Sequence, residues 1–96
     1  MSSISINELK QLIPRVNIID IRDSYQFNLG KINTARNIPM NFLLSNPSNY
    51  LNKNERYYLY CQSGSRSEKA CIMLTNKGYN VVNVLGGYNE YITVNE

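Results

Sequence analysis

The sequence of 96 residues contains no histidine and no tryptophan, and it has only two cysteines. Histidine is the residue that most often serves as a general base and metal ligand, so its absence excludes histidine-based catalytic triads and zinc sites. Any chemistry must depend on other side chains or on the backbone. The spacing of Cys61 and Cys71 fits neither a disulfide framework nor a C-x-x-C motif, which predicts a reducing compartment and no metal site.

Features of exported or membrane-inserted chains are also missing. The first residues have no basic and apolar leader, and no run of about 18 apolar residues occurs. These absences predict a cytoplasmic protein without a membrane partner. The formal charge is +3, but the ten Lys and Arg residues are dispersed along the chain, which argues against nucleic-acid binding. No segment is typical of an oligomerisation element, so we expect a monomer.

Length and composition indicate one small folded domain. With 43% hydrophobic and 18% charged residues, the composition is that of a globular protein rather than of a disordered chain. Typical domains contain roughly 100–150 residues. We therefore expect a single domain over residues 1–96.

Three short segments are rich in β-branched and aromatic residues and predict buried strands: Val16–Ile21, Arg56–Cys61 and Val81–Leu85. The stretches between them are long enough for helices, which favours parallel βαβ units. After the second strand, residues 65–78 predict a helix with serine candidates for its N-cap and Gly78 just beyond its end. The spacing of its apolar residues places Ala70 and Leu74 toward the sheet.

Shorter helices are expected elsewhere. A first helix, capped by Ser5 or Asn7, should end before Pro14. Two more short helices are predicted at Ser24–Leu29 and Asn41–Leu44, and the second of them should be followed by a loop.

The most informative segment is Cys61–Ser67, which lies between a predicted strand and a predicted helix. In open parallel sheets, ligands bind beyond the carboxyl ends of the strands, where Cys61 should lie. The turn into a helix can direct successive N–H groups inward, and Gly64 permits a backbone conformation closed to other residues. Such surroundings lower the pKa of a thiol, so Cys61 could be a nucleophile without a base. Cys71, inside the predicted helix, is interpreted as a core residue.

The sequence Cys-Gln-Ser-Gly-Ser-Arg-Ser at Cys61–Ser67 resembles the active-site loop of the rhodanese family of sulfurtransferases. Two further parts of the chain are similar to signatures of that family: Asp20–Phe27 with Gly30–Pro39, and Val84–Tyr91. The three matches occur in order and span nearly the whole chain. The resemblance therefore concerns the domain as a whole and not one short motif.

This resemblance implies a three-layer α/β/α rhodanese-like domain with a central, mostly parallel five-stranded sheet, which the alternation of predicted strands and helices supports. The first and third strands are weakly indicated by the sequence itself. Their expected places, near Ser3–Ile6 and Ala35–Asn37, depend on the family.

The resemblance also implies a sulfurtransferase that works by double displacement. The Cys61 thiolate would attack the sulfane sulfur of thiosulfate or of a persulfide, and would pass it to cyanide or to a thiol such as thioredoxin. Asp20 and Arg22 are candidates for supporting the site, although a structural ion pair is an equal alternative. No cofactor is implied. The loop supplies the expected substrate-binding residues, which are Gln62, Ser63, Gly64, Ser65, Arg66 and Ser67.

Three positions depart from the family pattern, and none of them is expected to touch the reacting sulfur. Gln26 replaces the usual Glu, so a hydrogen bond is expected in place of an ion pair with Arg22. Lys31 replaces a common His, and Tyr91 stands where Trp is frequent.

Two alternative functions stay open at this point. Cysteine-dependent phosphatases and arsenate reductases use a related loop with one more residue between Cys and Arg, whereas here only Gln62–Ser65 separates Cys61 from Arg66. A non-catalytic rhodanese-like module that binds a partner is the second alternative, but such modules usually lack the cysteine.

Overall fold

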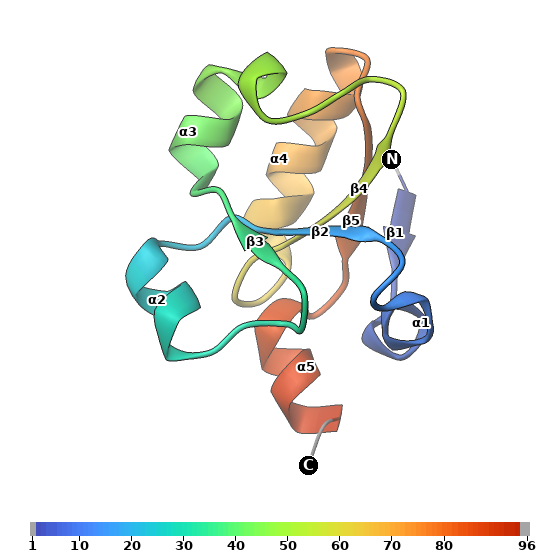
Figure 1. Cartoon of the computed structure of the whole chain (residues 1–96), viewed down its shortest axis with the longest axis vertical. Helices are drawn as coiled ribbons and strands as arrows, with labels where there is room; N and C mark the ends of the chain where they lie inside the picture. The colour runs from blue at the N-terminus through green and yellow to red at the C-terminus, as the bar shows by residue number, and fades with distance from the viewer. Residues whose placement is uncertain (1, 95–96) are drawn as a thin grey trace.

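The computed structural model describes residues 2–94, and its five strands form one central sheet (Figure 1). The strand order is β1-β5-β4-β2-β3, and each neighbouring pair is parallel. The prediction of an α/β fold with a five-stranded parallel sheet is therefore confirmed. The elements in chain order are β1 (Ser2–Ile4), α1 (Ile6–Leu12), β2 (Asn17–Asp20), α2 (Ser24–Leu29), β3 (Arg36–Asn37), α3 (Met40–Ser45), the 3₁₀ helix η1 (Pro47–Asn49), β4 (Arg56–Tyr60), α4 (Ser65–Asn76), β5 (Asn80–Val84) and α5 (Gly87–Val94).

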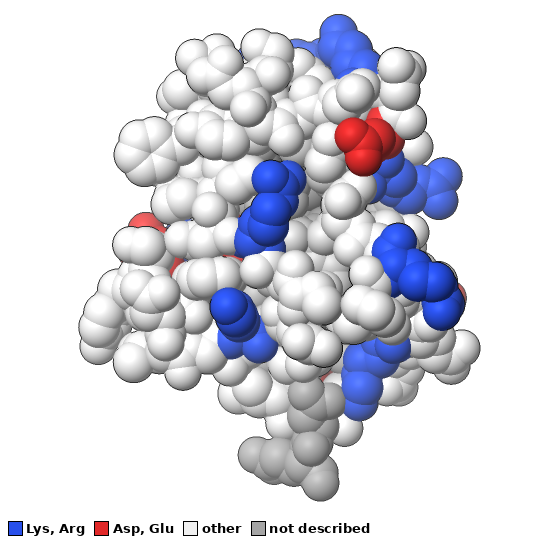
Figure 2. Space-filling view, viewed as in Figure 1, with Lys and Arg blue, Asp and Glu red and all other residues white. Residues whose placement is uncertain are grey.

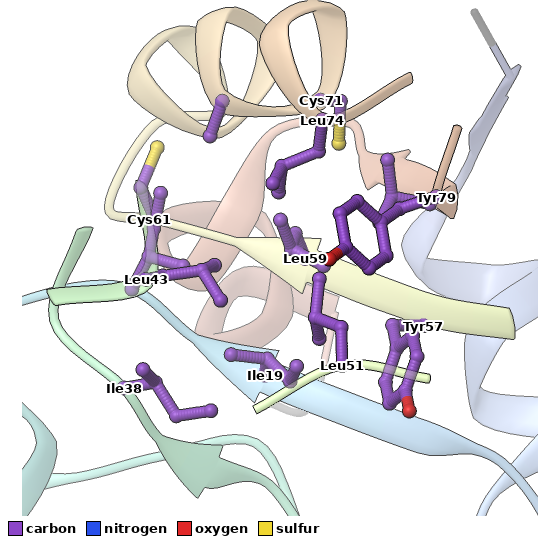
Figure 3. Close-up of a cluster of buried hydrophobic side chains, with 13 residues drawn as sticks. Ile19, Ile38, Leu43, Leu51, Tyr57, Leu59, Cys61, Cys71, Leu74 and Tyr79 are labelled. Carbon is purple, nitrogen blue, oxygen red and sulfur yellow. The ribbon is translucent and has the colours of Figure 1, made fainter. Parts of the chain in front are cut away.

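Helices cover both faces of the sheet, so the fold has three layers (Figure 1). One hydrophobic core lies between the sheet and the helices α3 and α4, as Figure 3 shows for Leu43, Leu59 and Leu74. The other core lies between the sheet and α1, α2 and α5. Side chains alternate across a strand, so Tyr58 and Tyr60 of β4 enter the second core while Leu59 enters the first.

The predicted strands in the middle of the sheet agree with the observed β2, β4 and β5 to within one residue at each end. Burial on both faces explains this agreement, because most residues inside such strands are apolar whichever face they point to. Of the two candidates for the first N-cap, the structure selects Ser5. Its hydroxyl accepts a bond of 3.1 Å from the N–H of Glu8, and the Glu8 carboxylate accepts one of 3.1 Å from the N–H of Ser5.

Two local predictions need correction, and one helix was missed. Helix α4 has no serine cap, because its N-cap is Gly64 in the left-handed region with φ of 101°. The segment after α3 contains η1 and is not all loop. Helix α5 was not predicted, because its first residue is Gly87 and Gly86 precedes it, and glycine disfavours helices. None of the helices within residues 2–94 is both long enough and apolar enough to cross a membrane.

Candidate active site

Cys61 follows the central strand β4 directly, at the carboxyl edge of the sheet and between the ends of β2 and β5. The residue is only 2% exposed. Its sulfur points from the sheet toward α4, while the sulfur of Cys71 points from α4 back toward the sheet (Figure 3). Both cysteines are free, and Cys71 lies in the core as predicted.

The loop after Cys61 directs hydrogen-bond donors at the sulfur. The N–H of Gly64 lies 3.1 Å from Sγ and the N–H of Ser67 lies 3.3 Å from it. The hydroxyl oxygen of Ser67 is 3.4 Å from the same sulfur. Donors that converge on one atom from a fixed backbone are suited to hold negative charge there, because they need no rearrangement when the charge forms.

The start of α5 explains why the loop adopts this shape. The N–H of Tyr88 donates to the carbonyl of Cys61 and the N–H of Asn89 donates to the carbonyl of Gln62, both at 3.0 Å. These bonds hold the two carbonyls toward α5, which leaves the following N–H groups to face the sulfur. Gly87 makes this approach possible, since a Cβ at that position would lie within van der Waals overlap of the Cys61 carbonyl oxygen.

The surroundings change the pKa of Cys61 in two opposing ways. Burial by itself raises the pKa of the thiol, because it penalises the charged form. The hydroxyl and the N–H of Ser67, followed by the N–H groups of Gly64 and Ser63, lower this pKa by more. The pKa of Cys61 therefore lies below its ordinary value, whereas burial raises the pKa of Cys71 to about 12. Cys61 is the thiol that can ionise and react.

Asp20 and Arg22, which the sequence marked as supporting candidates, form a buried bidentate ion pair. Arg22 Nη2 lies 2.7 Å from Asp20 Oδ2, and Nε lies 3.1 and 3.0 Å from the two carboxylate oxygens. The Tyr60 hydroxyl adds a bond of 2.7 Å to Oδ2. Burial raises the pKa of Tyr60, so its hydroxyl stays protonated as a donor. Neither Asp20 nor Arg22 hydrogen-bonds to the sulfur of Cys61.

Gln62 connects this ion pair to the loop. Its side-chain oxygen accepts a bond of 3.0 Å from Arg22 Nη1, and its side-chain nitrogen donates to Asn89 at 2.5 Å. Arg22 also donates to the carbonyl of Gly30 at 2.6 Å, and its guanidinium lies 4.3 Å from the ring centroid of Tyr88. The side chain of Gln62 thus ties the loop to the segment after β2 and to α5.

The other loop residues are exposed or contribute through their backbone. The hydroxyls of Ser63 and Ser65 lie 3.2 Å from each other on the surface. Arg66 is exposed at the start of α4, and within residues 2–94 its guanidinium has no hydrogen-bond or ion-pair partner. Its charge is therefore available to a ligand that approaches the loop.

The expected hydrogen bond between Gln26 and Arg22 does not form. The guanidinium of Arg22 bonds instead to Asp20, Gln62 and Gly30, and these acceptors leave no role for a residue in α2. The two other departures lie away from the sulfur. The Lys31 ammonium lies 4.6 Å from the ring centroid of Phe27, and the Tyr91 hydroxyl accepts a bond of 3.3 Å from the N–H of Asn33.

Sequence reasoning missed Asn83, a polar residue of β5 that is 1% exposed and accepts a bond of 2.6 Å from the Ser67 hydroxyl. A signal was present, because an amide inside the apolar sequence Val-Val-Asn-Val must find a buried polar partner. Among the side chains of residues 2–94, no group of three His, Cys, Asp or Glu is placed to hold a metal ion.

Replacing Ser67 with alanine is expected to raise the pKa of Cys61, because the thiolate loses a hydroxyl donor. At neutral pH, alkylation of Cys61 should become about tenfold slower, the effect of one hydrogen bond to a charged group. The pH dependence of alkylation by a small reagent measures this change. Ser65→Ala is the matched control, since that hydroxyl contacts only Ser63. A profile of Ser67→Ala that coincides with the Ser65→Ala profile would contradict the assignment.

Fold and site together define a cysteine-centred α/β domain in which backbone donors surround a single reactive thiol. The chain belongs to the rhodanese family, because residues 5–93 match the Rhodanese-like domain. At the level of the family it is a sulfurtransferase-type protein, since several relatives carry that name.

Three relatives illustrate the match. A putative sulfurtransferase from Bacillus subtilis, YtwF, is 30% identical over 91% of this chain and 84% of its own length. The crystal structure of SSP1007 from Staphylococcus saprophyticus has a TM-score of 0.88 and 41% identity over 95% of this chain and 93% of that one. The human single-domain sulfurtransferase TSTD1 has a TM-score of 0.85 and 25% identity over 97% and 96%. Other relatives are longer, and the chain spans 51% and 49% of two of them.

Proposed function

We propose that the protein is a sulfurtransferase that carries a sulfane sulfur on Cys61 as a persulfide. The observation that carries this proposal is the convergence of the Gly64 and Ser67 donors on the buried sulfur of Cys61. Because its donors surround a single sulfur atom, the loop is suited to stabilise a negative charge on one sulfur. Its four residues between Cys61 and Arg66 make a shorter ring than the loop of the related phosphatases, so a tetrahedral phosphate is not the expected substrate.

The proposed reaction has two displacements. In the first, the Cys61 thiolate attacks the sulfane sulfur of the donor, and the donor's S–S bond breaks. Its electron pair leaves with sulfite when the donor is thiosulfate, or with a thiolate when it is a persulfide. In the second, an acceptor thiolate or cyanide attacks the outer sulfur, and Cys61 leaves as a thiolate. The two steps need no external oxidant or reductant.

A persulfide is the donor that the charge of the site favours. Arg66 is the only cation of the loop, while Gln62, Ser63 and Ser65 are neutral, so the attraction for dianionic thiosulfate is weak. On the face of the molecule in Figure 2, Lys and Arg are scattered and do not form one basic patch, and an acidic group lies beside one of them. We therefore propose a low-molecular-weight or protein persulfide as donor and a cellular thiol, such as that of thioredoxin, as acceptor.

Mass spectrometry of the intact protein tests the function. After treatment with glutathione persulfide, the protein should gain one sulfur atom and lose it again when a thiol acceptor is added. Cys61→Ser should show no gain. Cys71→Ala should retain it, because that thiol is fully buried and its pKa is raised. Thiosulfate in a parallel reaction should load the protein more slowly.

Two other results would overturn the proposal. An unchanged mass with both donors would favour a non-catalytic binding module. Hydrolysis of a phenolic phosphate ester that depends on Cys61 would favour the phosphatase alternative.

A further inference from the structure

Asn83 is a buried amide in a strand whose neighbouring residues, Val82 and Val84, are apolar. It pairs with Leu59 across the sheet, and its side chain lies on the face that α4 covers. An amide in such a place lowers stability unless it is hydrogen-bonded. Its two polar atoms both point at the Cys61 loop, and the sulfur-transfer steps described above do not use them.

The orientation of the amide is fixed by its partners. Its nitrogen donates to the carbonyl of Gly64 at 3.4 Å, so its oxygen must face Ser67. A flipped amide would set its oxygen against the Gly64 carbonyl, and two acceptors would then face each other. Asn83 Oδ1 therefore needs the hydroxyl proton of Ser67.

Ser67 has a single hydroxyl proton and three possible acceptors. Asn83 Oδ1 is nearest at 2.6 Å, the Gly64 carbonyl lies at 3.1 Å and Cys61 Sγ at 3.4 Å. When Cys61 is a neutral thiol, its S–H can donate to the Ser67 oxygen while the hydroxyl proton points at Asn83. A thiolate has no proton to give and needs a donor, so it attracts the proton that Asn83 holds.

We propose that Asn83 competes with the Cys61 sulfur for the hydroxyl proton of Ser67 and thereby limits how strongly Ser67 stabilises the thiolate. Asn83 is then a positioning residue that acts through Ser67. The mechanistic meaning of this competition rests on the proposed sulfur transfer. The free thiolate draws the Ser67 proton, and in the persulfide the inner sulfur is neutral and a weak acceptor, so the proton returns to Asn83. Only the O–H bond turns, and no proton leaves Ser67.

Other ionisable groups lie on the elements packed around Cys61. Cys71 projects from α4 into the same core and stays a neutral thiol because its pKa is raised. Helix α3 carries no ionisable side chain. The other groups near the site are Arg66, Glu68 and Lys69 in the first part of α4, Tyr60 at the end of β4, the Asp20–Arg22 pair beyond Gln62, and Tyr88, Glu90 and Tyr91 on α5. None of these groups hydrogen-bonds to the Ser67 hydroxyl in the described part of the chain, so the acceptors that compete for its proton are Asn83 Oδ1, the Gly64 carbonyl and Cys61 Sγ.

The test is the pH profile of Cys61 alkylation by a small reagent in the full-length protein without a sulfur donor. Asn83→Leu removes the nearest competing acceptor at similar side-chain volume. The Gly64 carbonyl that remains is neutral, so it is a weaker acceptor than the thiolate. The inflection should move to lower pH, with alkylation about threefold faster below it, because a freed hydroxyl strengthens its bond to the thiolate. A change in access would scale the rate at every pH and leave the inflection in place.

The double variant separates the proposed competition from general loosening of the loop. In Ser67→Ala, no hydroxyl remains to be redirected, so Ser67→Ala/Asn83→Leu should have the same profile as Ser67→Ala alone. If Asn83→Leu does not fold, Asn83→Val fits the strand between two valines and should give the same shift to lower pH. A shift to higher pH, no shift, or an equal shift in both backgrounds would overturn the proposal.

The profile also separates this inference from the proposed function. If Cys61 is loaded with sulfur by a persulfide but the inflection of the alkylation profile does not shift in the variants, only the proposed competition is contradicted. If the inflection shifts as expected but the protein gains no sulfur, the competition stands and the sulfurtransferase function is contradicted.

Discussion

The Gly87→Ala variant is expected to lose about 3 kcal/mol or more of its free energy of unfolding, because the new methyl group would overlap backbone atoms of the active-site loop. A Cβ on Gly87 would lie 2.9 Å from the Gln62 carbonyl oxygen and even closer to that of Cys61. Backbone cannot move aside as a flexible side chain can. Relief would require α5 to withdraw, which breaks the bonds from Tyr88 and Asn89 to the two carbonyls.

Urea denaturation measures this loss, and Gly78→Ala provides the matched control. Gly87 and Gly78 both have a positive φ, of 55° and 93°, but a Cβ on Gly78 would contact only the flexible Lys53 side chain at 3.5 Å or more. Gly78→Ala should therefore show only the backbone cost of the left-handed region, about 1–2 kcal/mol. It should also leave the alkylation profile of Cys61 unchanged, whereas Gly87→Ala should alter it. Equal stability losses in the two variants would contradict the steric argument.

The sequence predicted the parts of the fold that repeat a simple pattern. After the exposed Arg56, strand β4 consists of Tyr and Leu residues that are buried on both faces, and that pattern is visible without a structure. Cys61 could be placed at the carboxyl edge of the sheet for the same reason, since it follows this strand directly. The Cys61–Ser67 motif then added a family resemblance that local periodicity could not supply.

The features that were missed depend on contacts between distant segments. Helix α5 begins at Gly87, which local propensity treats as a helix breaker, because its first N–H groups bind the loop after β4. Gly64, and not a serine, caps α4, since the loop must turn back toward the sulfur. Gln26 was assigned to Arg22 from the family pattern, but the guanidinium is already occupied by other acceptors. No local property of the sequence reveals these choices.

The Asp20–Arg22 ion pair connects segments of the structure and does not take part in the reaction. Both side chains are almost completely buried, and Arg22 bonds to β2, to the loop through Gln62 and to the carbonyl of Gly30. A buried ion pair of this kind adds little net stability compared with apolar residues of the same size. Loss of one partner, in contrast, leaves the other charge buried without compensation. The removal of Arg22 should therefore have a large effect.

Arg22→Met is expected to lower the free energy of unfolding by about 3–5 kcal/mol, because the Asp20 carboxylate stays buried without its cation. Arg15→Met is the control: Arg15 is exposed and makes one bond to the Gln11 carbonyl, so its loss should cost less than about 0.5 kcal/mol. Asp20→Asn/Arg22→Met removes both charges, and the Tyr60 hydroxyl keeps an acceptor in the new amide. The double variant should unfold at higher urea concentration than Arg22→Met alone.

Sulfur loading should respond differently from stability in the same variants. Gln62 loses the bond from Arg22 Nη1 in both the single and the double variant, so the loop is tied to α5 through Asn89 but no longer to β2. Persulfide formation on Cys61, followed by intact mass, should therefore stay slow in the double variant although its stability recovers. If the rate recovers together with the stability, Arg22 acts only by neutralising Asp20, and the tether through Gln62 has no part in shaping the site.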